Sequence, residues 1–145
     1  MIYFRSATPE DSEFLYQLKK KTMKEYIAQT WGWNEQIQRD YHQKNFNPEK
    51  CLIIQKKGQD IGCISIEEQP DTLFLNIIEI SPEFQNIGIG KSVIQDLIDK
   101  GLQENKGIAL QVLKVNHKAI KLYKTMGFAI SDETETHYYM IHSSN

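Results

Sequence analysis

The sequence has few cysteines and no long apolar run. Its 145 residues include two cysteines, Cys51 and Cys63, which are too few for a disulfide scaffold and lack the spacing of metal ligands. No apolar stretch approaches the roughly 18 residues that a membrane-spanning helix needs. Residues 1–5 also lack the long apolar segment of a signal peptide, so we expect a cytoplasmic protein that is not embedded in a membrane.

The sequence also lacks an excess of charge of either sign. Its 17 Lys and Arg residues stand against 19 Asp and Glu residues, which gives a formal net charge of −2. Nucleic-acid-binding domains usually carry a basic excess, so this balance argues against that class. Because the chain contains no repeat and no linker rich in Pro, Gly or Ser, we predict a single domain over residues 1–145.

The apolar periodicity predicts a mixed α/β protein. Helices are expected from Pro9 to beyond Ile27, from Asn34 to about Asn45, from Gly88 to about Glu104 and from about His117 to Met126, with Gly107 and Gly127 as stops after the last two. Strands are expected at residues 2–6, 51–55, 61–66, 72–80, 108–113, 128–130 and 137–141. The order β-α-α-β-β-β-α-β-α-β-β indicates a mixed sheet, not a regular series of parallel units. The strand at 72–80 is apolar almost throughout, which predicts burial on both of its faces.

A glycine-rich segment lies between the strand at 72–80 and the helix that follows Gly88. Glycines at positions 88 and 90 let the backbone turn sharply and bring its N–H groups close to a ligand. The first turn of the helix adds unpaired N–H donors and the positive end of the helix dipole. An anion such as a pyrophosphate is therefore the expected guest. The alternative is that Gly88 and Gly90 only close a tight strand-to-helix turn.

Two familiar nucleotide-binding motifs do not fit this segment. A P-loop ending at residues 90–92 would need glycine where Gln85 stands, and a Rossmann fingerprint starting at Gly88 would need glycine or alanine where Val93 stands. A nucleotide-binding protein is therefore disfavoured, and the segment is interpreted as a phosphate cradle of another kind.

Three motifs resemble those of one enzyme family. The pattern Q-x-x-G-x-G at residues 85–90 resembles the acetyl-CoA pyrophosphate loop of the GNAT superfamily of N-acetyltransferases. The pattern V-N-x-x-A-x-x-L-Y-x-x-x-G-F at residues 115–128 is similar to the second hallmark of that family, and F-R-x-A-T-x-x-D at residues 4–11 to its first strand and helix start. The resemblance extends over residues 2–141. Two departures are that Gln85 stands where Arg is a common alternative, and that Asn86 takes a place often held by Gly.

The resemblance implies a GNAT-like acyl-CoA N-acyltransferase fold with acetyl-CoA as co-substrate and no metal. In this family the strand corresponding to 72–80 splays from its neighbour at 108–113, and the pantetheine arm pairs with backbone groups near residues 78–80. The pyrophosphate lies on the N–H groups of residues 85–91. The residues so expected to bind the cofactor are Ile78, Ile80, Gln85, Asn86, Ile87, Gly88, Ile89, Gly90, Lys91, Ser92, Asn116, Ala119 and Tyr123.

Acyl transfer from a thioester to an amine requires a proton acceptor for the amine and benefits from a proton donor for the leaving thiolate. By resemblance, Tyr123 is the predicted general acid, and the alternative is a core tyrosine with a satisfied hydroxyl. Glu79 is the predicted base, because burial within an apolar strand would raise its pKa. One alternative is that Glu79 is a carboxylate at the end of the sheet that is paired with a cation or exposed to water. Another is that the base acts through a water molecule. His117 and His137 are further candidates for the base.

Aromatic residues gather around the turn between the first two helices, where the resemblance places the acceptor cleft. Tyr26, Trp31 and Trp33 are the predicted substrate-binding residues, since aromatic faces attract ammonium groups. The alternative is that one or both tryptophans pin the helices to the sheet.

Together these patterns predict an N-acetyltransferase that moves an acetyl group from acetyl-CoA to a primary amine of a small molecule or peptide, by direct attack in a ternary complex. The alternative is a non-catalytic acyl-CoA-binding sensor or regulatory domain. We expect no nucleic-acid partner, and a homodimer is compatible with the resemblance, since dimers are frequent among similar proteins.

Overall fold

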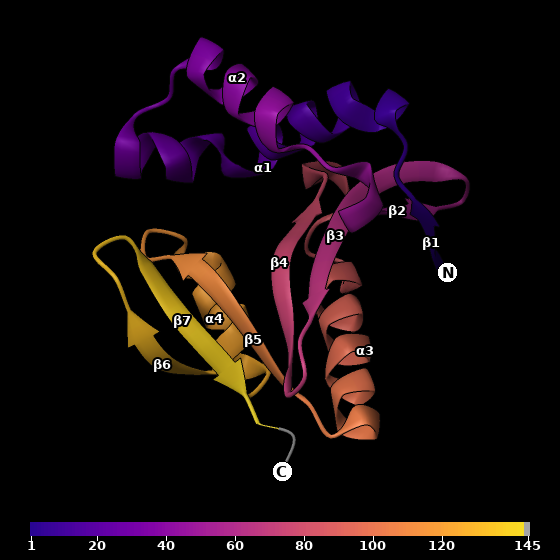
Figure 1. Cartoon of the computed structure of the whole chain (residues 1–145), viewed down its shortest axis with the longest axis vertical. Helices are drawn as coiled ribbons and strands as arrows, with labels where there is room; N and C mark the ends of the chain where they lie inside the picture. The colour runs from indigo at the N-terminus through magenta and orange to yellow at the C-terminus, as the bar shows by residue number, and fades with distance from the viewer. Residues whose placement is uncertain (144–145) are drawn as a thin grey trace. The chain divides into compact units, whose positions relative to one another are not determined.

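The computed structural model describes residues 1–143 and has the element order expected from the sequence. The helices are α1 (Ser12–Trp31), α2 (Glu35–Asn45), α3 (Ile89–Glu104) and α4 (His117–Thr125) (Figure 1). The strands are β1 (Ile2–Ser6), β2 (Leu52–Lys56), β3 (Gln59–Glu68), β4 (Thr72–Ile80), β5 (Gly107–Leu113), β6 (Ala129–Glu133) and β7 (His137–His142). Three 3₁₀ turns complete the list, namely η1 (Pro9–Asp11), η2 (Pro48–Lys50) and η3 (Pro82–Phe84). The mixed α/β class is confirmed.

The strands follow the order β1-β2-β3-β4-β5-β7-β6. The pairs β1–β2, β2–β3, β5–β7 and β6–β7 are antiparallel, whereas β4 and β5 are parallel, so the sheet is mixed as predicted. The chain forms two compact units. Unit 1 contains residues 1–65 and 77–85, and unit 2 contains residues 66–76 and the chain from residue 86 onward, so β3 and β4 each pass from one unit to the other.

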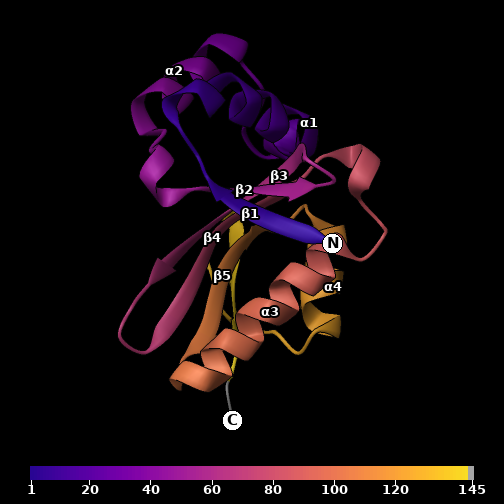
Figure 2. The ribbon, with the colours of Figure 1, turned by 90° about the vertical axis from the view of Figure 1, so that its right-hand side faces the viewer.

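In unit 1, helix α1 packs on strands β2 and β3. Its buried residues Leu15 and Leu18 form a core cluster with Ala7, Ile53 of β2 and Cys63 of β3, and Phe14, Phe46 and Cys51 pack against that cluster. Apolar residues at helical spacing on α1 thus meet inward-facing residues of two neighbouring strands. Helix α2 runs alongside α1 (Figures 1 and 2). It begins as predicted at Asn34, whose side-chain oxygen accepts a hydrogen bond from the Ile37 N–H at 2.9 Å.

One arginine ties the first strand to the start of α1. The Arg5 guanidinium donates to both carboxylate oxygens of Asp11, at 2.9 and 2.8 Å, and to both of Asp60, at 3.3 and 2.8 Å. Asp11 also accepts from the Thr8 N–H at 2.8 Å. This capping arrangement fixes where the chain leaves β1 and enters the helix.

In unit 2, one side of helix α3 is buried. Its buried residues Val93, Ile94, Leu97 and Ile98 form the predicted stripe, although Leu102 is 49% exposed. Figure 2 shows α3 and α4 on the same side of β5.

The end of α4 was predicted correctly from the sequence, and the end of α3 was not. Helix α3 ends at Asn105, which takes the left-handed conformation with φ 56°, so the expected stop at Gly107 is wrong. Gly107 opens β5 instead. Gly127 follows α4 with φ 98°, as predicted.

Strand β4 is buried less uniformly than its apolar sequence predicts. Leu73 and Leu75 are buried, but Ile77 is 43% exposed. The parallel register joins Thr72–Leu75 of β4 to Gly107–Leu110 of β5. Burial on both faces is therefore wrong for the stretch beyond that register.

Candidate functional site

Glu79 lies near the end of β4, in unit 1, as a partly buried carboxylate. The Cys63 thiol of β3 donates a hydrogen bond to its Oε1 atom, with 3.9 Å between sulfur and oxygen. Burial raises the pKa of Glu79 to about 7, although the Lys19 ammonium and the Cys63 thiol both act to lower it. The structure thus gives this carboxylate the raised pKa that the sequence suggested.

Strands β3 and β4 approach each other closely at this position. A Cβ atom built on Gly62 would lie 2.4 Å from the backbone oxygen of Glu79. The neighbouring Ser81 N–H donates to the Ile61 carbonyl at 2.8 Å. Sequence reasoning missed Gly62 and Cys63 as neighbours of the site. A glycine inside an otherwise apolar strand is the signal that points to such a close backbone approach.

Lys19 of α1 is the cation whose charge acts on the pKa of Glu79. Its Nζ atom lies 4.7 Å from the centre of the Tyr41 ring on α2. Burial lowers the pKa of Lys19, and the Glu79 carboxylate opposes that change. The opposite charges of Lys19 on α1 and Glu79 on β4 therefore attract each other.

The glycine-rich segment forms a turn with two left-handed residues. Asn86 has φ 63° and Gly88, the N-cap of α3, has φ 89°. Asparagine tolerates this conformation better than most residues, so its presence at a position often held by glycine preserves the turn. Nothing lies within 4 Å of a Cβ built on Gly88, which leaves space beside the backbone. The N–H groups of the first turn of α3 are free of intrahelical partners, as at any helix start, and can face an anion.

Gln85 precedes this turn in unit 1, and its side chain has a local role. Its Nε2 atom donates to the Ile80 carbonyl at 2.8 Å, which closes the segment after β4. Its extended backbone leads from η3 into the left-handed turn.

On α4, Asn116 and Ala119 form the helix cap. The Asn116 side-chain oxygen accepts from the Ala119 N–H at 3.2 Å. Tyr123 lies on the same helix, 8% exposed, with its ring centre 5.7 Å from that of Phe128. Burial raises the pKa of Tyr123 to about 12. The phenol therefore keeps its proton at neutral pH, whether it acts on a substrate or only packs.

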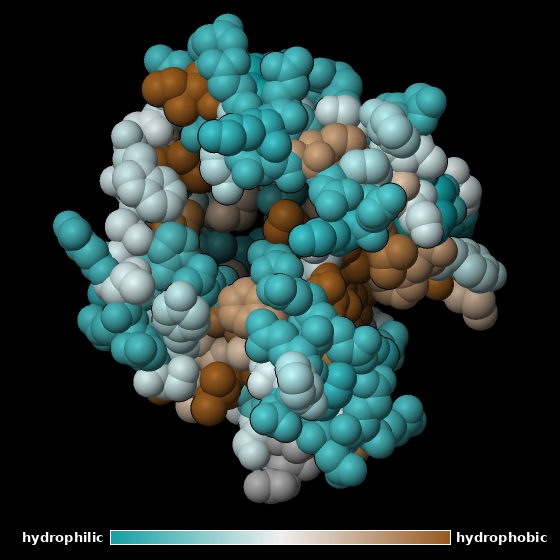
Figure 3. Space-filling view, viewed as in Figure 1, coloured by the Kyte–Doolittle hydropathy of each residue, from teal (hydrophilic) through white to brown (hydrophobic). Residues whose placement is uncertain are grey.

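The aromatic residues at the α1–α2 turn differ in environment. Trp31 is 61% exposed, so it does not pin α1 to the sheet. Trp33 is half-buried, and its indole N–H donates to Glu35 at 3.0 Å. Tyr26 is half-buried on α1. Over α1 and α2, at the top of the view, hydrophilic side chains predominate with a few apolar groups between them (Figure 3).

The two histidines considered as bases lie in unit 2, on other elements than Glu79. His117 opens α4 and is exposed, and His137 contacts the Thr136 hydroxyl at 2.8 Å through Nδ1. Burial lowers the pKa of His137. Neither belongs to a group of three or more metal-binding side chains, and no such group occurs among residues 1–143.

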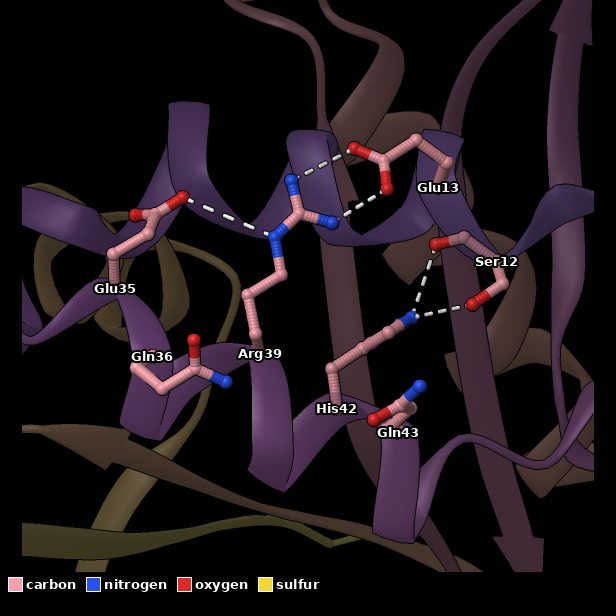
Figure 4. A pocket seen from close by; sticks show the side chains of 7 residues that line it. All are labelled: Ser12, Glu13, Glu35, Gln36, Arg39, His42 and Gln43. Atoms are coloured by element: carbon pink, nitrogen blue, oxygen red, sulfur yellow. Dashed lines mark hydrogen bonds and ion pairs between the residues drawn. The ribbon is translucent and has the colours of Figure 1, made fainter.

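A separate hollow of about 560 Å³ lies between α1 and α2 (Figure 4). It is lined by Ser12, Glu13, Glu35, Gln36, Arg39, His42 and Gln43, none of which was predicted as a site residue. The Arg39 guanidinium forms a two-pronged ion pair with Glu13 and lies 3.9 Å above the Tyr16 ring. This ion pair links α2 to α1 beside the hollow and leaves neither of these two charges unpaired.

The predicted residues fall into two groups. Ile78, Glu79, Ile80 and Gln85 lie in unit 1, together with the aromatic residues of the α1–α2 turn. Residues 86–92 and the α4 residues Asn116, Ala119 and Tyr123 lie in unit 2. Within the described part of the chain, no helix is long and apolar enough to cross a membrane.

Comparison with known proteins adds independent information. The model of the acetyltransferase (GNAT) family matches residues 15–128. The structure resembles the PaiA N-acetyltransferase of Thermoplasma acidophilum, solved with coenzyme A, with a TM-score of 0.80, 18% identity and coverage of 99% of each chain. It also resembles the ribosomal-protein-S18-alanine N-acetyltransferase of Escherichia coli, with a TM-score of 0.68, 18% identity and coverage of 98% of this chain and 93% of that one.

A third similar structure is Arabidopsis thaliana Naa50 in complex with the bisubstrate analogue CoA-Ac-MVNAL, with a TM-score of 0.66, 18% identity and coverage of 98% of each chain. No curated protein is similar enough in sequence to be matched. At these identities the structural likeness establishes the fold, which is the one expected from the sequence motifs.

Proposed function

The chain belongs to the acetyltransferase (GNAT) family, and we propose that it moves the acetyl group of acetyl-CoA to a primary amine of a small molecule or peptide. The observation that carries this proposal is the family match over residues 15–128, within which the partly buried Glu79 carboxylate has a pKa raised to about 7. A base with such a pKa is well matched to accepting a proton near neutral pH.

The residues around the start of α3 fit the phosphate groups of acetyl-CoA. Left-handed conformations at Asn86 and Gly88 bend the backbone so that successive N–H groups can converge on an anion. The space beside Gly88 lets a ligand approach the main chain. When bound, acetyl-CoA would supply the activated thioester, and this turn would hold its pyrophosphate.

Glu79 would remove a proton from the acceptor ammonium, directly or through a water molecule. The free amine then attacks the thioester carbonyl and the C–N bond forms. The nitrogen gives up its second proton, the C–S bond breaks, and the thiolate takes up one proton as it leaves. Because the thioester is already activated, alignment of the two substrates supplies much of the acceleration.

Tyr123 would hold a proton at its phenolic oxygen for the leaving sulfur. With a pKa of about 12 it is a weak acid, so it acts mainly as a hydrogen-bond donor to the sulfur as negative charge develops there, and any proton that it gives up is replaced by the second proton of the attacking nitrogen. Burial raises this pKa because it disfavours the charged phenolate, so the phenol of Tyr123 stays protonated.

The acceptor would be bound near Tyr26, Trp31 and Trp33. The exposed ring of Trp31 can face an ammonium group, and the peptide portion of the analogue bound to Naa50 makes peptide N-termini reasonable acceptors to test. Both cysteines are free thiols, which suits the cytoplasmic location that we propose.

Two measurements test the proposal. Titration calorimetry with CoA, ATP and NAD should show binding of CoA in preference to the two nucleotides. Release of CoA thiol should then be measured across polyamines, aminoglycosides, amino acids and peptide N-termini. Binding of ATP or NAD without CoA would refute the acetyl-CoA assignment, and CoA binding without turnover on any acceptor would favour a regulatory acyl-CoA-binding domain.

A further inference from the structure

The hydrogen bond between Cys63 and Glu79 joins the site to the core of unit 1. Cys63 is 3% exposed, and its sulfur lies 3.9 Å from Glu79 Oε1. A thiol has one proton to donate and a carboxylate has none, so the direction of this bond is fixed while the carboxylate is ionised. The following argument rests on the proposed role of Glu79 as the base.

Packing holds the Cys63 thiol in place. Cys63 lies opposite Ile53 in the β2–β3 register, and both belong to the cluster that α1 covers with Leu15 and Leu18. On its other side, the adjacent Gly62 lies against the Glu79 backbone. A side chain enclosed in this way has little freedom to turn from the carboxylate.

The groups that act on the Glu79 carboxylate come from two elements besides β4. Lys19 on α1 attracts it by charge, and Cys63 on β3 donates to it. Both stabilise the ionised form against the cost of burial. The Cys51 thiol contacts the Cys63 thiol, and the charge of Glu79 acts on Cys51 as well.

We propose that Cys63 is a positioning residue for the acetyl transfer: its buried thiol orients the Glu79 carboxylate and favours the ionised form that accepts the proton. Cys63 touches neither substrate in this scheme and acts through Glu79. A substitution that removes the Cys63 thiol should therefore leave the Glu79 carboxyl group in place but more often protonated at neutral pH.

The direct test is a titration of Glu79 in the free protein. Protein labelled with ¹³C at glutamate side chains is followed by NMR from pH 5 to 9, and the Glu79→Gln variant identifies the signal. In Cys63→Ala the pKa of Glu79 should rise above its value in the unaltered protein. In Cys63→Ser, whose hydroxyl can also donate, the pKa should return toward that value.

Ile53→Val is the matched control, because it loosens the packing of the same cluster opposite Cys63 and leaves the thiol and Glu79 in place. It should leave the Glu79 titration unchanged. Thermal unfolding of all three variants checks that each is folded. The proposal is wrong if Cys63→Ala titrates like the unaltered protein, or if Cys63→Ala and Cys63→Ser shift the pKa equally.

The kinetic counterpart is the pH profile of kcat/KM with the best acceptor. Cys63→Ala should lower kcat/KM about fivefold at pH 6 and change it little at pH 9, where the base is ionised in either protein. An equal loss at both pH values would show a merely structural role for Cys63. Lack of CoA binding and of thiol release in the unaltered protein would refute the proposed function instead, and the NMR titration would still decide whether Cys63 controls Glu79.

Discussion

Gly62 and Glu79 are in backbone contact: a Cβ at position 62 would lie 2.4 Å from the Glu79 carbonyl oxygen. Real Cβ atoms do not approach an oxygen so closely, so any side chain at position 62 must displace β4 at the residue proposed as the base. The absence of a side chain on one strand thereby sets the place of a functional side chain on the next.

Gly62→Ala should lower the free energy of unfolding by about 1–3 kcal/mol, as overpacking in a filled interior does. It should also lower kcat, because the Glu79 backbone must move. Urea unfolding and steady-state kinetics measure the two effects. Gly58→Asn is the control, since a Cβ there meets nothing within 4 Å and asparagine tolerates its φ of 75°. An unaltered kcat in a folded Gly62→Ala protein would contradict this dependence.

Glu79→Gln should remove the acid limb of the pH–rate profile. The base must be ionised to accept a proton, so kcat/KM should rise as the pH passes through about 7 and then level off. In Glu79→Gln the rate should be low and nearly independent of pH over this range. A limb that persists in the variant would assign it to another group, such as the acceptor amine.

Although Glu79→Gln should lower activity, it should raise the free energy of unfolding above neutral pH. The pKa of Glu79 is raised on folding from 4.5 to about 7, so the folded state holds its proton more firmly and stability falls as the pH rises between these values. Above pH 7 the buried charge is a cost, and Glu79→Gln should be more stable than the unaltered protein by about 1–3 kcal/mol at pH 8. Urea unfolding at pH 4 and pH 8 checks the sign, and a gain at pH 4 alone would contradict it.

Gly88→Val should weaken CoA binding at least about tenfold, because its φ of 89° suits glycine and its side chain would fill the space beside the turn. Calorimetric titration with CoA measures this. Gly32→Val is the matched control, since Gly32 has a φ of 84°, similarly open surroundings and no place in the phosphate turn. Both variants should lose stability, and only Gly88→Val should lose affinity. Equal CoA affinity in the two would discredit the turn as a phosphate site.

Tyr123→Phe should reduce kcat at least about tenfold while changing the Kd for CoA little. The phenol carries the proton intended for the leaving thiolate, whereas the ring supplies packing against Phe128 that phenylalanine retains. Tyr139→Phe removes a hydroxyl elsewhere in unit 2 and should leave kcat unchanged. Full turnover by Tyr123→Phe would return this residue to a purely structural role.

The fold was largely accessible from the sequence because its signals are local. The Asn34 cap and the Gly127 stop depend on neighbouring residues, and both were predicted. Asn105 was missed as the end of α3 because a glycine two residues later carries the stronger signal. Exposure of Ile77 was missed because an apolar run does not reveal where the pairing with a neighbouring strand ends.

The candidate site was predicted less completely. Glu79 and the glycine turn stand out by residue type, since one is a carboxylate in an apolar strand and the other a pair of glycines at a helix start. The other residues of the site become important through contacts between elements. Gly62 and Cys63 lie on β3, and Lys19 lies on α1, 60 residues before Glu79. Apart from the glycine within an apolar strand, which signals the close backbone approach at Gly62, such contacts across the fold leave no periodic or local trace in the sequence.

The α1–α2 turn has an optical consequence. The chain contains two tryptophans, Trp31 and Trp33, and both belong to this turn. Trp31 is exposed to water, whereas the indole N–H of Trp33 is bonded to a carboxylate. With excitation that tryptophan absorbs and tyrosine does not, the emission of the unlabelled protein therefore arises from this turn alone, and its quenching or spectral shift would report events there.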